Sequence, residues 1–234
     1  MHTMDADPRL RRRDLLRVSA GALALWAHPH AVLGAEPAPA SDDDPASPTD
    51  ALAALRDGNA RFAGGQLLQP RRELDRLKQL GEGQKPWAAI FGCADSRVPV
   101  ELVFDEGFGD LFVVRVAGNV ATAVEIASLE YAVAVLGVQA ILVLGHANCG
   151  AVKAALAGSA VPGQISTLYQ HIVPGIDRAA DDVPAAITAN VRFQARKLRD
   201  GSPVIGTALK DGKLALAGGV FDLGSGRVTA VEVG

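Results

Sequence analysis

Cysteine, aromatic residues and long apolar runs are all scarce in this chain of 234 residues. Cys93 and Cys149 are the only cysteines, so the chain can form at most one internal disulfide. Aromatic residues make up 5%, the formal net charge is −3, and the one dense basic cluster lies at the N-terminus, which together argue against a nucleic-acid-binding protein. No GxGxxG or P-loop pattern follows a predicted strand, so a nucleotide-binding α/β protein is set aside. The remaining composition, 49% hydrophobic and 21% charged, fits one soluble globular domain with a substantial core.

The basic cluster at the N-terminus belongs to a segment with the pattern of an export signal. Arg11-Arg12-Arg13-Asp14-Leu15-Leu16-Arg17 precedes an apolar stretch, residues 18–26, that is too short to span a bilayer, and small residues end near Gly34-Ala35. Residues 12–16 resemble a twin-arginine signal, although a Sec signal or an uncleaved anchor stays open. We therefore expect residues 1–35 to be a cleaved signal peptide, the mature protein to be periplasmic or otherwise extracytoplasmic, and no stable membrane span to remain after cleavage.

The segment after the signal changes composition twice. Residues 36–49 are rich in Ala, Pro, Ser and Asp and bury too little apolar area to order themselves, so we interpret them as a linker. The folded domain is expected over residues 50–234, with Thr49 or Asp50 capping its first helix. Residues 51–62 and 71–80 have apolar residues at helical spacing and end at glycines, which predicts an N-terminal helical arm.

The rest of the chain alternates buried strands with helices. Continuous apolar runs predict strands at residues 87–92, 111–116 and 141–144, and helical patterns follow at 120–136, after Gly150 and from Val183. Residues 203–208 and 214–221 flank Asp211-Gly212, a strong hairpin signal. This order predicts an α/β fold: a mostly parallel central sheet flanked by helices, with an antiparallel C-terminal strand.

Metal-ligand side chains follow two of the predicted strands. His146 and Cys149 lie in the turn after residues 141–144, and Cys93, Asp95 and Arg97 follow residues 87–92, where an extended backbone would place all three on one side. The carboxyl ends of parallel strands meet at one edge of a sheet, where α/β proteins place their ligands.

Two thiolates and an imidazole suit zinc, with Asp95 or water in the fourth position. Beyond residue 35, His146 and His171 are the only histidines, so the choice of imidazole is narrow. In an oxidising compartment a Cys93–Cys149 disulfide competes with the metal interpretation.

With these residues in view, the chain resembles the β-class carbonic anhydrases over nearly all of residues 50–232. The matching motifs are Cys93-Ala94-Asp95-Ser96-Arg97, Phe112-Val113-Val114-Arg115-Val116-Ala117-Gly118-Asn119, Glu130-Tyr131-Ala132-Val133 and Gly145-His146-Ala147-Asn148-Cys149-Gly150-Ala151-Val152.

The resemblance implies specific roles. Cys93, His146 and Cys149 would bind Zn²⁺, and Asp95 would pair with Arg97 as a catalytic dyad, binding the metal itself only in a closed state. Gln84 stands nine positions before Cys93, as in the plant-type, open-site subgroup. With Gly150, it would bind substrate, and Phe112 and Tyr131 match pocket positions of the family. Val116 and Ala147 replace an asparagine and a serine common in the family, which puts hydrogen bonds around the ligands in doubt.

The implied activity is the reversible hydration of CO₂ to bicarbonate and a proton by zinc-bound hydroxide. Two alternatives stay open: hydrolysis of a CO₂ analogue, carbonyl sulfide or carbon disulfide, on the same fold, and a non-catalytic exported domain that binds zinc or is stapled by a disulfide. The resemblance also implies a homodimer or higher homo-oligomer whose pocket is completed across the interface.

Overall fold

A computed structural model of the chain describes residues 44–234. The predicted signal peptide and most of the predicted linker lie outside these residues. The part of the linker inside them is ordered by the fold: Ser47 caps α1 by accepting a hydrogen bond from the Asp50 N–H, so the cap precedes both predicted candidates. The Pro45 carbonyl accepts a hydrogen bond from Gln139, which ties this segment to the sheet.

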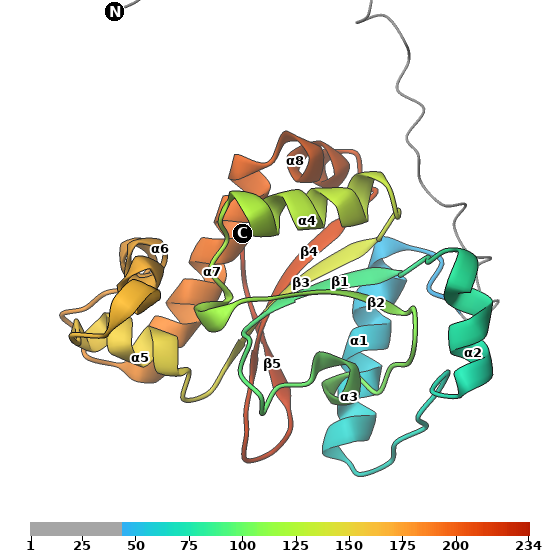
Figure 1. Cartoon of the computed structure of the whole chain (residues 1–234), viewed down its shortest axis with the longest axis horizontal. Helices are drawn as coiled ribbons and strands as arrows, with labels where there is room; N and C mark the ends of the chain where they lie inside the picture. The colour runs from blue at the N-terminus through green and yellow to red at the C-terminus, as the bar shows by residue number, and fades with distance from the viewer. Residues whose placement is uncertain (1–43) are drawn as a thin grey trace, which may run out of the picture. The chain divides into compact units, whose positions relative to one another are not determined.

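The described residues form a five-stranded sheet in the order β2-β1-β3-β4-β5, covered by helices on both faces, as predicted (Figure 1). All neighbouring strands pair in parallel except β4 and β5, which are antiparallel. The strands are β1 (Ala88–Gly92), β2 (Leu111–Arg115), β3 (Ala140–His146), β4 (Ala215–Phe221) and β5 (Val228–Val231). The helices are α1 (Pro48–Ala63), α2 (Leu74–Gln79), α3 (Val100–Val103), α4 (Ala123–Ala134), α5 (Gly150–Ala157), α6 (Tyr169–Ile172), α7 (Val183–Gly201) and α8 (Pro203–Lys210), with short 3₁₀ turns at Leu80–Glu82, Ala117–Asn119, Gly163–Leu168 and Val173–Gly175.

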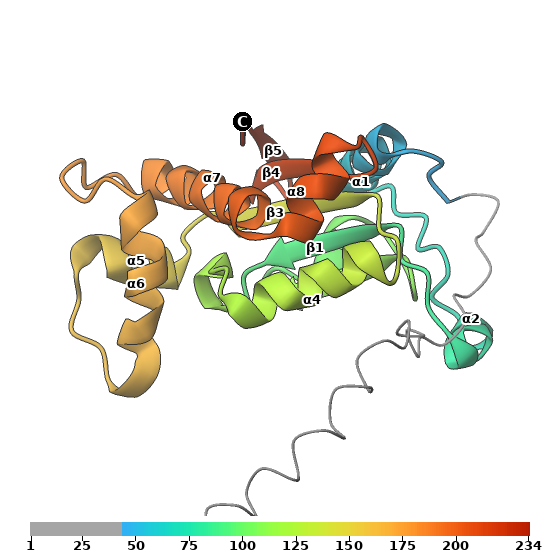
Figure 2. The same cartoon turned by 90° about the horizontal axis from the view of Figure 1, so that it is seen from above.

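The central strands are buried on both faces, which is why their sequences are continuous apolar runs rather than alternating ones. Alternate residues of each strand enter different cores. Ile90 and Leu142 pack with Leu55 of α1, whereas Phe91 and Val143 pack with Val191 of α7. Figure 2 shows α4, α7 and α8 together, running along the sheet. Within residues 44–234 no helix is both long enough and apolar enough to cross a membrane.

The hairpin predicted around Asp211-Gly212 is wrong, because residues 203–210 form helix α8. Ser202 caps this helix, accepting a hydrogen bond from the Ile205 N–H at 3.1 Å, and Pro203 occupies its first turn, where a missing N–H does no harm. Asp211 and Gly212 then turn the chain from α8 into β4. The antiparallel partner of β4 is β5, further along the chain.

A buried cluster of carboxylates joins α3 to the segment after α1. Asp105 is fully buried and accepts hydrogen bonds from the Leu68 and Gln69 N–H groups at 2.9 and 3.0 Å. Glu106 is buried beside Asp110, and burial, followed by the charge of Asp110, raises the pKa of Glu106 to about 8. Glu106 therefore keeps its proton in the folded protein at pH values where it would be ionised in the unfolded chain.

A Glu106→Gln variant should make the protein less sensitive to rising pH. The folded state of the parent holds an extra proton between the ordinary glutamate pKa and about 8, so the parent loses stability as pH rises through this range. We expect the free energy of unfolding of the variant, relative to the parent, to grow by about 1–3 kcal/mol from pH 6 to pH 9 in urea titrations. Glu101→Gln, at an exposed carboxylate of α3, is the matched control for the loss of one carboxylate from this segment. A constant difference for Glu106→Gln would contradict the prediction.

Candidate metal centre

The three predicted metal ligands lie at the carboxyl ends of neighbouring strands. Cys93 directly follows β1, His146 is the last residue of β3, and Cys149 is the N-cap of α5. β1 and β3 are hydrogen-bonded in parallel with Gly92 opposite Leu144, so the two strands end side by side (Figure 1). Asn148 adopts a left-handed conformation, φ 58°, which lets the chain turn tightly between the second and third ligands.

The potential ligand atoms converge closely. One ligand atom from each of Cys93, His146 and Cys149 lies within 4.8 Å of the others, and the two sulfurs are 4.0 Å apart. Both thiols are free, and the three residues are at most 5% exposed. The disulfide alternative is therefore not the arrangement seen in the structure.

The imidazole of His146 is oriented for a ligand at Nε2. Its Nδ1 lies 3.0 Å from the Ala147 carbonyl, so the Nδ1–H tautomer donates there and leaves the lone pair on Nε2. Nε2 is buried and has no hydrogen-bond partner. A buried nitrogen beside two thiols with no hydrogen-bond partner of its own fits a metal-binding histidine, because an unsatisfied buried polar atom is otherwise costly.

The two thiols affect each other's ionisation in a way that favours binding of a cation. The Cys149 side chain, then His146 and the Gly118 N–H, lower the pKa of Cys93 to about 4 against the opposing effect of burial. The interaction with Cys93, together with burial, raises the pKa of Cys149. One thiolate therefore forms readily and opposes the second, so a cation that binds both sulfurs would relieve the repulsion. The donor set, two sulfurs and an imidazole nitrogen, fits a zinc-type ion.

The segment from Cys93 to Asp95 is held by Arg115 at the end of β2. The Arg115 guanidinium donates to the carbonyl of Cys93 at 2.8 Å and to that of Asp95 at 2.5 Å. One side chain thus fixes both the first ligand and the carboxylate two residues later. Arg115 is part of a motif matched in the sequence. Its position as a charged residue at the end of an apolar strand was the available signal that it holds the neighbouring strand end.

Asp95 and Arg97 form the predicted pair, but through a turn rather than an extended strand. The Arg97 N–H donates to Asp95 Oδ1 at 2.9 Å, and the Val98 N–H bonds back to the Asp95 carbonyl at 3.1 Å. The guanidinium then makes two further bonds, Nε to Oδ1 at 2.9 Å and Nη2 to Oδ2 at 2.8 Å. The extended alternation therefore ends at Asp95, because an aspartate that accepts the N–H two residues on favours a turn.

The carboxylate of Asp95 faces the metal ligands. Its Oδ2 lies 3.7 Å from His146 Nε2, while its pKa is held well below the usual range, chiefly by the hydrogen bonds from Arg97. Asp95 is therefore ionised at neutral pH and lies within reach of a molecule bound next to His146.

The predicted substrate-binding residues fall into two groups. Gly150 begins α5 directly beside Cys149, so its N–H is one of the unpaired donors at that helix end. Gln84 is exposed and precedes the amino end of β1, whereas Cys93 follows the carboxyl end. Phe112 pairs with Ala89 near the start of β1, and its ring lies 6.3 Å from that of Tyr131. Within one chain, therefore, three predicted substrate-binding residues lie toward the amino ends of the strands, whereas the predicted metal ligands lie at the carboxyl ends. These residues are Gln84, Phe112 and Tyr131.

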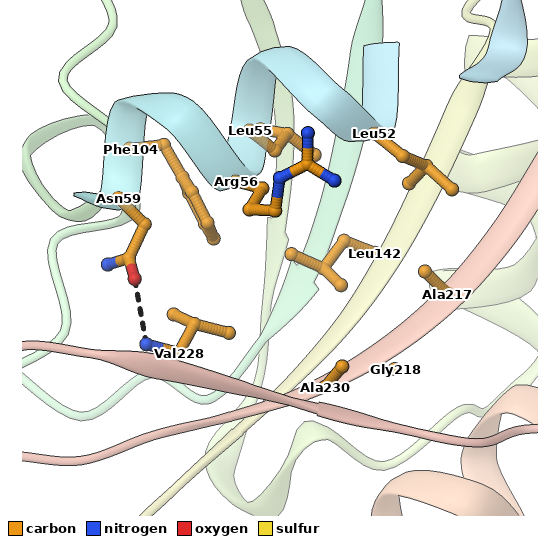
Figure 3. Close-up of a pocket in the computed structure, with 10 residues that line it drawn as sticks. All are labelled: Leu52, Leu55, Arg56, Asn59, Phe104, Leu142, Ala217, Gly218, Val228 and Ala230. Atoms are coloured by element: carbon orange, nitrogen blue, oxygen red, sulfur yellow. Dashed lines mark hydrogen bonds between the residues drawn. The ribbon is translucent and has the colours of Figure 1, made fainter. Parts of the chain in front are cut away.

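Two hollows lie outside the cluster of Cys93, His146 and Cys149. The hollow in Figure 3, about 240 Å³, lies between α1 and strands β3, β4 and β5, and none of the predicted site residues lines it. Its wall is mostly apolar, and the hydrogen bond from the Val228 N–H to Asn59, which bounds it, fastens β5 to α1. A second hollow of about 560 Å³ is lined by Arg97 together with Phe62 and Phe221, so Arg97 borders open space on this side.

The sequence did not point to Asn190 and Gln194, two buried amides of α7 that contact the loop beside Cys93. The available signal was a pair of polar residues four apart on the apolar face of a predicted helix, which is the spacing of side chains that act together.

Comparisons with known proteins agree with this arrangement. Residues 88–228 match the family model described as carbonic anhydrase. A carbonic anhydrase of Mycolicibacterium smegmatis is 40% identical over 190 residues, which cover 78% of this chain and 92% of that protein. Among solved structures, the β-carbonic anhydrase CcaA is 30% identical with a TM-score of 0.61, over 76% of this chain and 86% of that one. Two tetrameric β-carbonic anhydrases of Sordaria macrospora were solved together, and the matching chain is 28% identical with a TM-score of 0.58, over 74% and 93% of the two chains. The chain therefore belongs to the β-class carbonic anhydrase family.

Proposed function

We propose that this carbonic anhydrase catalyses the zinc-dependent, reversible hydration of CO₂ to bicarbonate and a proton. The observation that carries the proposal is the buried cluster of Cys93, His146 and Cys149, with a free Nε2 lone pair and a carboxylate beside it. Zinc held by these three residues would supply Lewis acidity that makes a water molecule nucleophilic near neutral pH.

In this proposal Asp95 and Arg97 control protons and access. Asp95 Oδ2 accepts one bond from Arg97 and keeps a lone pair for a hydrogen-bond donor on the His146 side. The three bonds from Arg97 hold the carboxylate back, so it accepts a hydrogen bond instead of binding the metal itself. The Gly150 N–H, at the start of α5, would stabilise negative charge on a substrate oxygen.

The experiment that tests the function is stopped-flow CO₂ hydration by the zinc-loaded mature protein, run beside assays for carbonyl sulfide and carbon disulfide hydrolysis. Rapid CO₂ hydration supports the proposal. Zinc-dependent turnover of a sulfur analogue without CO₂ hydration would replace it with the alternative substrate class, and one firmly bound zinc without any turnover would leave a metal-binding module.

We also propose a homodimer or higher homo-oligomer in which Gln84, Phe112 and Tyr131 of one copy complete the pocket of another. Their position toward the amino ends of the strands, away from the ligands of the same chain, supports a pocket shared between copies. So do exposed apolar side chains on α2 and α4: Leu74 is 64% exposed and Tyr131 is 45% exposed. The Sordaria macrospora relatives are tetrameric.

A subunit-mixing experiment tests this shared pocket. Gln84→Ala alone should lower kcat/KM about 100-fold, the cost of removing one donor to the reacting oxygens. A mixed dimer of Gln84→Ala and Cys149→Ser chains, purified with two different tags, should regain about half the activity of the parent dimer, because one pocket combines an intact metal site with an intact Gln84. If the mixed dimer stayed as weak as the Gln84→Ala protein, Gln84 would not act across the interface.

Finally, we propose that residues 1–35, outside the described part of the chain, direct export by the twin-arginine route. The support is the run Arg12-Arg13-Asp14-Leu15-Leu16 before a moderately apolar segment. Cell fractionation tests it: replacing Arg12 and Arg13 with lysine should leave the uncleaved precursor inside the cell, and normal export of that variant would refute the route.

A further inference from the structure

Helix α7 carries two buried amides on one side, Asn190 and Gln194, which are 1% and 0% exposed. They lie four residues apart, so their side chains are neighbours on the helix surface. Gln194 Nε2 donates to Asn190 Oδ1 at 2.9 Å and to the His171 carbonyl at 2.8 Å, while Gln194 Oε1 accepts the Ala121 N–H at 2.9 Å. Every polar atom of Gln194 is thus satisfied, and one of its bonds orients Asn190.

Asn190 in turn holds the loop that follows β2. Its Nδ2 donates to the Gly118 carbonyl at 2.9 Å and contacts Asn119 Oδ1 at 3.4 Å. Lys197, one turn beyond Gln194, bonds to the Ala121 carbonyl at the other end of the same loop. The loop is therefore fixed from a helix some 70 residues away in sequence.

This loop has a conformation that it would not keep by itself. Gly118 and Asn119 both have positive φ, 72° and 44°. Positive φ is uncommon for a residue with a side chain and persists where the surroundings hold it. A Cβ at Gly118 would come within 3.1 Å of both Ile172 Cδ1 and Ala151 Cβ, so little room remains for a different path.

The result of this conformation is a hydrogen bond to a metal ligand. The Gly118 N–H donates to Cys93 Sγ at 3.2 Å. A hydrogen bond to a ligating sulfur withdraws charge from it, which strengthens the Lewis acidity of a metal that already has a second thiolate. The direction of the bond also fixes where the sulfur sits.

We infer that Asn190 and Gln194 are positioning residues for the metal centre: through the Gly118 loop they hold an N–H on the sulfur of Cys93. Asn190 is the direct support and Gln194 orients Asn190, so the effect of replacement decreases in that order. The consequence for turnover rests on the proposed function, whereas the effect on metal binding does not.

The test measures metal binding in three variants. Asn190→Asp puts acceptor oxygens against the Gly118 carbonyl, and Asn190→Ser shortens the side chain so that its hydroxyl does not reach that carbonyl, without adding charge. We expect both to weaken zinc binding about 10–100-fold in competition with a chelator, and to shift the sulfur-to-metal charge-transfer absorption of the Co²⁺-loaded protein. Gln194→Met should also weaken zinc binding and shift the Co²⁺ absorption, but by less than either Asn190 variant. CO₂ hydration is measured separately, so a parent that binds zinc without turnover defeats the proposed function and leaves this inference standing.

Ser202→Ala is the matched control. Ser202 is also buried, at 1% exposure, and follows the same helix, but it bonds to Glu130 and Ile205. Its loss should lower the free energy of unfolding without changing zinc affinity or the Co²⁺ spectrum. The inference is overturned if Asn190→Ser keeps the affinity and spectrum of the parent, or if Ser202→Ala changes them as much.

Discussion

A Cys149→Ser variant is expected to lose more than about 100-fold in zinc affinity and essentially all CO₂ hydration, the largest effect foreseen for a single change. A serine hydroxyl does not ionise near neutral pH and is a poor ligand for zinc, so the loss exceeds the 10–100-fold cost of disturbing an outer partner. The site would keep Cys93 and His146 but lack the third protein ligand.

Two measurements check this expectation: zinc content after dialysis against a chelator, and stopped-flow CO₂ hydration at saturating zinc. Lys153→Gln, an exposed position on the same helix α5, is the control and should match the parent in both. Circular dichroism of Cys149→Ser shows whether the fold persists. A folded variant that keeps one zinc per chain and normal turnover would remove Cys149 from the metal centre and leave the proposed mechanism without its basis.

An Arg97→Gln variant is expected to keep its zinc and yet lose CO₂ hydration about 100–1,000-fold. In the parent, Arg97 makes three hydrogen bonds to the Asp95 carboxylate and keeps it ionised. The substitution keeps the backbone N–H bond but removes the two guanidinium bonds, so the carboxylate would be able to turn toward a bound metal and occupy the position where substrate chemistry must occur. Arg97→Lys, which cannot make the paired bonds, should fall between the parent and Arg97→Gln.

A double variant separates this blocking effect from a direct role of Arg97. If Arg97 acts only through Asp95, then Asp95→Asn/Arg97→Gln should be no less active than Asp95→Asn alone, which is a non-additive result for residues in contact. The Co²⁺ spectrum of Arg97→Gln should also change, because an oxygen ligand is added, and Asp95→Asn should reverse that change. Additive losses with an unaltered spectrum would show that Arg97 does not act by restraining Asp95.

Much of the sheet was predictable because its strands carry their own signal. The apolar runs at residues 87–92, 111–116 and 141–144 correspond to β1, β2 and β3, with bounds that differ by at most two residues. The prediction for residues 203–210 was wrong because Val204 and Ile205 resemble a strand, and the Asp-Gly pair that follows resembles a hairpin turn. Ser202 and Pro203 in fact start a helix there, whose residues Ile205 and Leu209 pack in the core beside α7. Capping and tertiary packing outweighed local strand preference.

By itself, the sequence determined the chemistry that is possible here: two thiols, few histidines, and an Asp-x-Arg triplet after an apolar strand. It also determined that these residues follow strands, since short-range patterns decide where strands end. Only the tertiary structure decided that the sulfurs lie 4.0 Å apart and unbonded, that Gln84 lies away from the ligands of its own chain, and that Asn190 supports the loop beside Cys93. These facts depend on contacts between segments far apart along the chain. The spacing of Asn190 and Gln194 marks two polar residues on one helix face, but it does not say which loop they contact, because that partner is brought to them only by the folded backbone.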